Sequence, residues 1–197
     1  MGRDMKKQQA QLPSAAQVEQ ELQREQYRRR YRKTLKSTIF TLVTAAAVAV
    51  LVATLWMPVL QIYGSSMTPT LQEGQIVLSV KASEMKPGDI VAFYYGNKVL
   101  IKRYIAGPGA WVDIQQDGPV LVDGEVLDEP YLTEKHFGIC DIELPYQVPD
   151  ETCFLMGDQR RTSVDSRHSS VGCVTQEQII GRIVFRVWPM KEFGFVR

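Results

Sequence analysis

Two serines stand side by side in the stretch GSSMTPTL, residues 64–71. A serine attacks a carbonyl carbon when a neighbouring base removes its proton, and histidine is the base in the Ser-His-Asp triad. The chain has two histidines, and His168 follows Asp165 closely, so a triad is conceivable. Neither the order nor the spacing of these residues is typical of one. We therefore expect His168 to be an exposed loop residue.

An uncharged lysine can replace histidine as the base. Because the ordinary lysine pKa is about 10.4, the amine loses its proton near neutral pH only if burial or another cation lowers that pKa. Lys102 lies in the apolar stretch VLIKRYIA and fits this requirement, although an exposed lysine that protects a sheet edge would have the same pattern. Side chains alternate along a strand, so Lys102 and Arg103 should face opposite sides, one inward and one outward.

A third polar stretch, MGDQRRTSVDSR, ends at Arg167. Ser163 or Asp158 could hold the other reacting groups. Asp165 could form a charged brace with Arg160 or Arg167. Composition alone does not separate this interpretation from a salt-bridged surface loop.

The charge distribution divides the 197-residue chain into unlike parts. Residues 1–36 carry a net charge of +6 and the remainder −5, and no charged residue occurs between Ser37 and Gln72. The apolar run is long enough to cross a bilayer as a helix, and the preceding basic cluster RRRYRK places that side in the cytoplasm. A cleaved signal peptide would have a shorter leader. We expect a cytoplasmic tail at 1–36, a transmembrane signal-anchor helix at 37–60 and an extracytoplasmic domain at 61–197.

The domain after the anchor has the pattern of a mainly β protein. Short apolar or aromatic runs at 74–80, 89–95, 99–106 and 179–189 are separated by turn sequences such as KPGD, YGNK and GPG. Many short strands with glycine-rich turns predict an antiparallel barrel or sandwich. Residues 128–150 lack periodicity and are expected to form a long loop.

The three cysteines, Cys140, Cys153 and Cys173, all lie in this domain. Their spacing is not that of a metal site. Either one disulfide, with Cys140–Cys153 as the candidate pair, or three free thiols would fit an extracytoplasmic domain.

Taken in order, four blocks resemble the type I signal peptidases, which are membrane-anchored Ser-Lys endopeptidases. The blocks are GSSMTPTL, GDIVAF, KRYIAGPG and GDQRRTSVDSR, and the segment GRIVFRVWPMKEFG near the end is also similar. The resemblance runs from residue 61 to about residue 194 and includes the position of the anchor. It implies the signal-peptidase β fold and cleavage of signal peptides from exported preproteins.

The resemblance also selects among the candidate residues. It implies that Ser66, directly before the methionine, is the nucleophile, that Lys102 is the base and that Ser163 orients the lysine. Asp158, Asp165 and Arg167 match supporting positions. The implied substrate-binding residues are Gln61, Ile62, Tyr63, Gly64, Ser65, Leu100 and Ile101.

Two departures from the family pattern stand out. Many relatives have a serine two residues before the nucleophile, and it helps to bind the oxyanion. Here that position is Gly64, which resembles the glycine-bearing Gram-positive branch. Gln159 replaces an asparagine.

The resemblance implies no metal or cofactor. The expected partners are preproteins and membrane lipid, with no nucleic acid, for a monomer in the plasma membrane. Two alternatives stay open, namely a Ser-Lys protease for one dedicated exported substrate and an inactive membrane-tethered β module.

Overall fold

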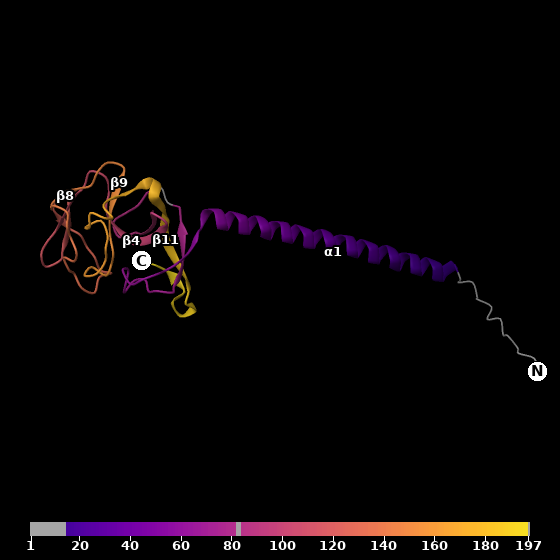
Figure 1. Ribbon diagram of the computed structural model, residues 1–197. Coiled ribbons are helices and arrows are strands. Elements are labelled where there is room, and N and C mark those ends of the chain that lie inside the picture. Colours follow the sequence, from indigo (N-terminus) through magenta and orange to yellow (C-terminus); the bar gives the residue numbers. More distant parts are fainter. Residues whose placement is uncertain (1–14, 82–83, 197) are drawn as a thin grey trace, which may run out of the picture. The chain divides into compact units, whose positions relative to one another are not determined.

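The computed structural model describes residues 15–81 and 84–196, with only the backbone for residues 52–56. Its N-terminal element is one long α-helix, α1 (Ala15–Trp56), drawn in indigo and purple in Figure 1. Most of the predicted tail at 1–36 belongs to this helix, and residues 1–14 lie outside the described part. Within α1, the segment Ala15–Leu51 contains a stretch long and apolar enough to cross a membrane.

Two hydroxyls in the apolar part of α1 are satisfied within the helix. Thr41 donates to the carbonyl of Ser37 at 2.9 Å, and Thr44 donates to that of Phe40 at 2.8 Å. Bonds to the carbonyl four residues back let threonine lie in a nonpolar environment without an unpaired hydroxyl.

The helix ends at Trp56, shortly before Pro58. Proline lacks the N–H that an α-helix needs and disfavours helical backbone in the residue before it. The chain then forms strand β1 (Val59–Gln61), so the helix ends four residues before the predicted boundary at residue 60.

The rest of the chain forms two antiparallel sheets. In the larger sheet the order is β1-β2-β11-β3-β4-β9-β10, with β12 paired to β11. Its other strands are β2 (Ile76–Val80), β3 (Ile90–Tyr95), β4 (Lys98–Ala106), β9 (Thr152–Met156), β10 (Val174–Thr175), β11 (Ile179–Trp188) and β12 (Gly194–Phe195). Two short 3-10 helices, η1 (Gln176–Gln178) and η2 (Met190–Glu192), flank β11.

The smaller sheet has the order β7-β6-β5-β8. Its strands are β5 (Trp111–Ile114), β6 (Val120–Val122), β7 (Glu125–Val126) and β8 (Tyr146–Gln147). Figure 1 shows β8 and β9 in neighbouring layers of the β domain. The predicted mainly antiparallel β fold is confirmed, although residues 128–150 are not all loop because β8 pairs with β5.

The first part of β3 (residues 90–93) and the second half of β4 (residues 102–106) are buried on both faces. Along β3, Ile90 and Ala92 belong to one hydrophobic cluster, whereas Val91 and Phe93 belong to another. Because successive side chains point to opposite faces, two separate clusters must cover the two sides of the sheet here. This double cover decides the surroundings of Lys102 and Arg103.

All three cysteines are free, so of the two alternatives left by the sequence, the Cys140–Cys153 disulfide is excluded and three free thiols are found. Cys153 is buried in β9, where its thiol donates to the carbonyl of Val174 at 3.4 Å. Burial raises the pKa of the Cys153 thiol to about 12, and the nearby Cys173 adds to this. Cys140 instead lies in the irregular segment before β8 and donates to the carbonyl of Ile142 at 3.9 Å.

Candidate active site

A groove of about 630 Å³ lies between the segment that begins with β1 and the first half of β4. Its walls are largely apolar, with one serine at the end of the first segment. The lining residues are Val59, Leu60, Gln61, Ile62, Tyr63, Gly64, Ser66, Met67, Lys98, Val99, Leu100 and Ile101. Six of the seven predicted substrate-binding residues are among them, and the seventh, Ser65, is exposed and is not.

Ser66 lies at the start of a tight turn that follows the groove wall. The N–H of Thr68 donates to the carbonyl of Ser65 at 3.1 Å, and that of Leu71 donates to the carbonyl of Met67 at 2.8 Å. Met67 and Leu71 are 2% and 0% exposed, so they anchor the turn in the core. The chain enters the turn through Gly64, whose φ of 80° lies in the left-handed region that favours glycine.

Lys102 projects from the middle of β4 and is 3% exposed. Its Nζ donates to the Oγ of Ser163 at 3.0 Å. Burial lowers the pKa of Lys102, the charges of Asp165 and Asp158 oppose this shift, and the charge of Arg167 reinforces it. The alternative of an exposed edge-strand lysine is therefore wrong, because β4 lies between β3 and β9 in the larger sheet.

Gly157 brings the loop of Ser163 against the turn of Ser66. A Cβ at this position would overlap the Oγ of Ser163 and lie 2.6 Å from the carbonyl oxygen of Ser66. The N–H of Gln159 also donates to the Ser66 carbonyl at 3.0 Å. The three stretches that carry Ser66, Lys102 and Ser163 therefore meet at one place.

Asp165 and Arg167 form the charged brace that the sequence suggested. The guanidinium donates to both carboxylate oxygens of Asp165 at 2.8 Å, and both side chains are fully buried. Burial alone would raise the pKa of Asp165, but bonding to Arg167 holds it below its ordinary value. Arg167 also donates to the carbonyl of Phe137 at 2.7 Å, and Asp165 accepts from the N–H of Gly157 at 2.9 Å. This brace fixes both ends of the loop that carries Ser163.

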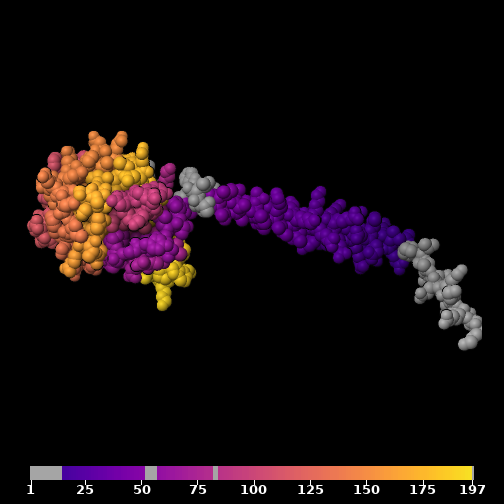
Figure 2. Space-filling view, in the orientation of Figure 1, coloured from indigo at the N-terminus to yellow at the C-terminus, as the bar shows by residue number. Residues whose placement is uncertain are grey.

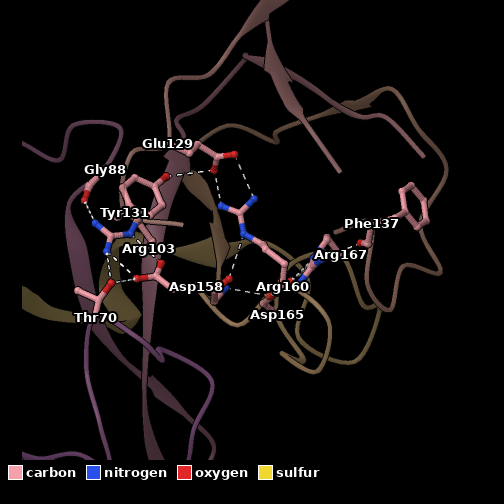
Figure 3. A network of polar contacts seen from close by, with 11 residues as sticks. Thr70, Gly88, Arg103, Glu129, Tyr131, Phe137, Asp158, Arg160, Asp165 and Arg167 are labelled. Atoms are coloured by element: carbon pink, nitrogen blue, oxygen red, sulfur yellow. Dashed lines mark hydrogen bonds and ion pairs between the residues drawn. The ribbon is translucent and has the colours of Figure 1, made fainter. Parts of the chain in front are cut away.

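The prediction that only one of Lys102 and Arg103 faces inward is wrong. Arg103 is 1% exposed, because both faces of β4 are covered. Its Nε and Nη2 donate to the two carboxylate oxygens of Asp158 at 2.8 and 2.6 Å, and its Nη1 donates to the carbonyl of Gly88 at 2.6 Å. The guanidinium also lies 3.6 Å from the ring centroid of Tyr131 (Figure 3).

A third buried ion pair, between Arg160 and Glu129, was not predicted from the sequence. Arg160 pairs with Glu129, not with Asp165 as considered above, and its Nη1 donates to Glu129 Oε2 at 3.3 Å. The hydroxyl of Tyr131 donates to the same carboxylate at 3.1 Å. Burial, followed by the Glu129 charge, raises the pKa of Tyr131. As Figure 3 shows, Tyr131 thus connects the Arg160–Glu129 pair to the Arg103–Asp158 pair.

His168 lies apart from these groups. Its Nε2 is 3.6 Å from Asp141, and its Nδ1 is 2.8 Å from the Oγ of Ser170. The imidazole therefore has neither of the partners that a Ser-His-Asp triad with Ser66 and Asp165 would require.

Comparison with known proteins gives the family. The family described as "Signal peptidase, peptidase S26" matches residues 35–188 of this chain. Signal peptidase I of Bacillus caldolyticus is 35% identical over 164 residues, which cover 74% of this chain and 88% of that protein. Signal peptidase IB of Staphylococcus aureus (strain MRSA252) is 32% identical over 154 residues, which cover 68% of this chain and 79% of that protein. A solved signal peptidase I from Enterococcus faecalis V583 aligns with a TM-score of 0.44 and 25% identity, over 52% of this chain and 98% of that chain.

The family match spans all four sequence blocks, and the two relatives, a signal peptidase I and a signal peptidase IB, are each more than 30% identical to this chain. The chain therefore belongs to the signal peptidases of peptidase family S26, serine endopeptidases that cleave signal peptides from preproteins.

Proposed function

We propose that the protein cleaves signal peptides with a Ser-Lys dyad, in which Ser66 is the nucleophile and Lys102 the general base. The observation that carries the proposal is the state of Lys102. Its amine is buried, its pKa is lowered, and its bond is to the neutral hydroxyl of Ser163. Within residues 15–81 and 84–196 it makes no ion pair, so no carboxylate in contact stabilises its charged form.

The reaction begins when neutral Lys102 takes the proton of the Ser66 hydroxyl and the oxygen attacks the scissile carbonyl. The backbone N–H of Ser66 stabilises the resulting oxyanion, and one such donor contributes about 3–4 kcal/mol in other proteases. Protonated Lys102 then gives its proton to the leaving amine, and an ester links the substrate to Ser66. Lys102 next removes a proton from water, which hydrolyses the ester.

The supporting residues position this dyad. Ser163 holds the amine of Lys102 by the 3.0 Å bond, and the Asp165–Arg167 pair holds the loop of Ser163. Gly64 has no side chain that could serve as a second oxyanion donor, so we assign no residue to that role.

The substrate binds as an extended strand in the groove between residues 61–65 and residues 98–101. Backbone bonds hold the peptide, and the apolar walls formed by residues such as Ile62, Leu100 and Ile101 accept small side chains before the cleaved bond. Ser66 is one of the lining residues, so a peptide bound in the groove lies beside the proposed nucleophile.

We further propose that α1 anchors the protein in the plasma membrane, with the N-terminus in the cytoplasm and the β domain outside. Support comes from the apolar stretch in α1 and from the basic cluster Arg28–Lys33 that precedes it. Only a few residues separate the end of α1 from β1, which keeps the β domain beside the lipid surface, where signal peptides end. The protein acts as a monomer on preproteins and needs no nucleic acid.

The test is cleavage of a preprotein with alanines one and three places before the cut, in membranes or detergent. Ser66→Ala and Lys102→Ala should each abolish cleavage, while Ser65→Ala, the matched control next in the chain, should retain it. Full cleavage by either dyad variant would refute the proposal. An intact wild-type protein that cleaves one exported substrate but no ordinary preprotein would indicate a dedicated protease instead.

A further inference from the structure

The turn that carries Ser66 is held in place by contacts that do not involve the side chains of Ser66 and Lys102. Its apolar side chains enter the core, and its first carbonyl is bonded by Gln159, as described above. At its other end lies Thr70. The Thr70 hydroxyl donates to Asp158 at 2.5 Å and accepts from Arg103 at 3.3 Å, as Figure 3 shows. The backbone carbonyl of Thr70 is bonded separately, by the Nη2 of Arg186 at 2.6 Å.

Arg186 reaches Thr70 because of the irregular shape of β11. The pairing of β11 with β2 shifts register between Ile183 and Phe185 and again between Arg186 and Trp188. Bulges redirect side chains out of the regular alternation, and here two of them flank one arginine. The Arg186 side chain is 16% exposed and lies at the end of the turn, next to the carbonyl of Thr70.

The arginine is itself fixed by the segment that follows β11. Its Nη1 pairs with Glu192 in η2. Glu192 also accepts from the Nε2 of Gln75 at 2.8 Å, and the Oε1 of Gln75 accepts from the N–H of Gln72 at 3.1 Å. The C-terminal residues, yellow in Figure 2, are thus bonded to the turn at Thr70 and to the chain that follows it at Gln75.

We propose that Arg186 is a positioning residue for the reaction, which holds the Ser66 turn against movement away from Lys102. The inference rests on the proposed role of Ser66 as nucleophile. Lysine and arginine side chains often bond the last carbonyls of a helical turn, and here that bond ties the turn to a strand in the middle of the sheet. A misplacement of about 1 Å at a reacting group lowers the rate by about 10²-fold, so a remote bond of this kind affects turnover.

This role predicts a particular kinetic pattern. The groove is lined by residues before the turn and by β4, so loss of Arg186 should leave substrate binding largely intact. Lys102 and its surroundings are also untouched. The variant should therefore lower kcat while KM and the pH dependence of kcat stay as in the wild type.

The experiment uses the full-length protein in detergent with a preprotein substrate. Arg186→Met keeps the apolar stem and removes both bonds, and we expect kcat per folded molecule to fall by about ten-fold to 10²-fold, with KM changed less than about two-fold. Arg186→Lys keeps one donor and should recover part of the loss. Arg182→Met is the matched control, because Arg182 lies on the same strand and, within the described part of the chain, its ion pair is with Asp89. Its kcat should stay within about two-fold of the wild type.

Two outcomes would overturn the inference. One is a kcat of Arg186→Met that, corrected for the folded fraction, equals that of Arg182→Met. The other is a shifted pH profile, which would mean that the substitution acts on Lys102 rather than on the turn. Ser66→Ala is measured alongside. If it is inactive and Arg186→Met is normal, only the positioning role fails, whereas an active Ser66→Ala overturns the dyad and the inference together.

Discussion

Lys102 and Arg103 are adjacent basic residues of β4, and both are buried, but their partners differ. Arg103 meets a carboxylate, a carbonyl and an aromatic face, so its charge is fully compensated. Lys102, on the other side of the same strand, meets one hydroxyl. Burying a charge without a partner is unfavourable, so burial lowers the pKa of Lys102, whereas a paired arginine keeps its proton.

Under the proposed mechanism, this difference separates a reactive group from a structural one. Both are basic residues, both are buried, and they are adjacent in sequence. What distinguishes them is the partner, and these partners, Ser163 and Asp158, lie 61 and 55 residues further along the chain. Breaking each partnership should therefore have opposite consequences for stability and activity.

The largest effect is expected for Lys102→Met, which keeps the volume of the side chain and removes the amine. Cleavage should fall by about 10⁴-fold or more, as it does when a base is removed from a serine protease. Lys102→Arg should be equally inactive, because a guanidinium does not give up its proton. Preprotein cleavage by purified protein measures both, and activity within ten-fold of the wild type in either variant would contradict the comparison.

The pH dependence of the stability of Lys102→Met tests the charge of Lys102 without an activity assay. Between the lowered pKa of Lys102 and its ordinary value of 10.5, the unfolded chain binds a proton that the folded protein does not. Lys102 therefore makes stability rise with pH across this window, and Lys102→Met should remove that slope. Urea unfolding of the Ser66→Ala protein with and without the substitution measures it. An unchanged slope would mean that Lys102 stays charged in the folded state.

Arg103→Met should act mainly on stability, in contrast to Lys102→Met, which should act mainly on activity. It leaves Asp158 buried without its cation, so the free energy of unfolding should fall by about 3–5 kcal/mol. The double variant Arg103→Met with Asp158→Asn should lose less than the two single variants together, because no uncompensated charge remains. Denaturant unfolding measures the three. Strict additivity would show that the two side chains do not form a coupled pair.

Sequence reasoning reached Lys102 but not the surroundings of Arg103. An apolar stretch with one lysine fitted both a desolvated amine and an exposed edge-strand lysine, and the resemblance to a family selected Lys102 together with Ser66 and Ser163. The alternation rule failed for Arg103 because it assumes that one face of the sheet meets solvent, whereas β3 and β4 are covered on both. Glu129 lies in a segment without periodicity, so no pattern marked it as buried. The charge-rich stretch at 156–167 suggested Arg160 or Arg167 as the partner of Asp165, but it did not indicate the pairs that Arg160 and Asp158 form with residues outside the stretch.

Ser163→Ala tests the one hydrogen bond that the comparison assigns to the amine of Lys102. Without the hydroxyl the amine loses its bond and its fixed orientation, and kcat should fall by about 10²-fold. Ser166→Ala is the matched control, since Ser166 is also buried in this block but accepts from the N–H of Leu155 at 3.0 Å. That variant should lose about 1 kcal/mol of stability and little activity. Equal kcat values for the two variants would remove Ser163 from the site.

The smallest expected effect concerns Tyr131 on the side of Arg103. Tyr131→Phe keeps the ring over the guanidinium and removes the hydroxyl bond to Glu129, which should lower stability by about 1 kcal/mol. Tyr131→Leu removes the ring as well and should lower it by a further 0.5–2 kcal/mol, roughly the value of a buried cation–π contact. Neither variant touches Lys102, so kcat per folded molecule should not change. Because the aromatic face belongs to the compensation of Arg103, a kcat that falls in Tyr131→Leu would show that the two sides of β4 are not independent.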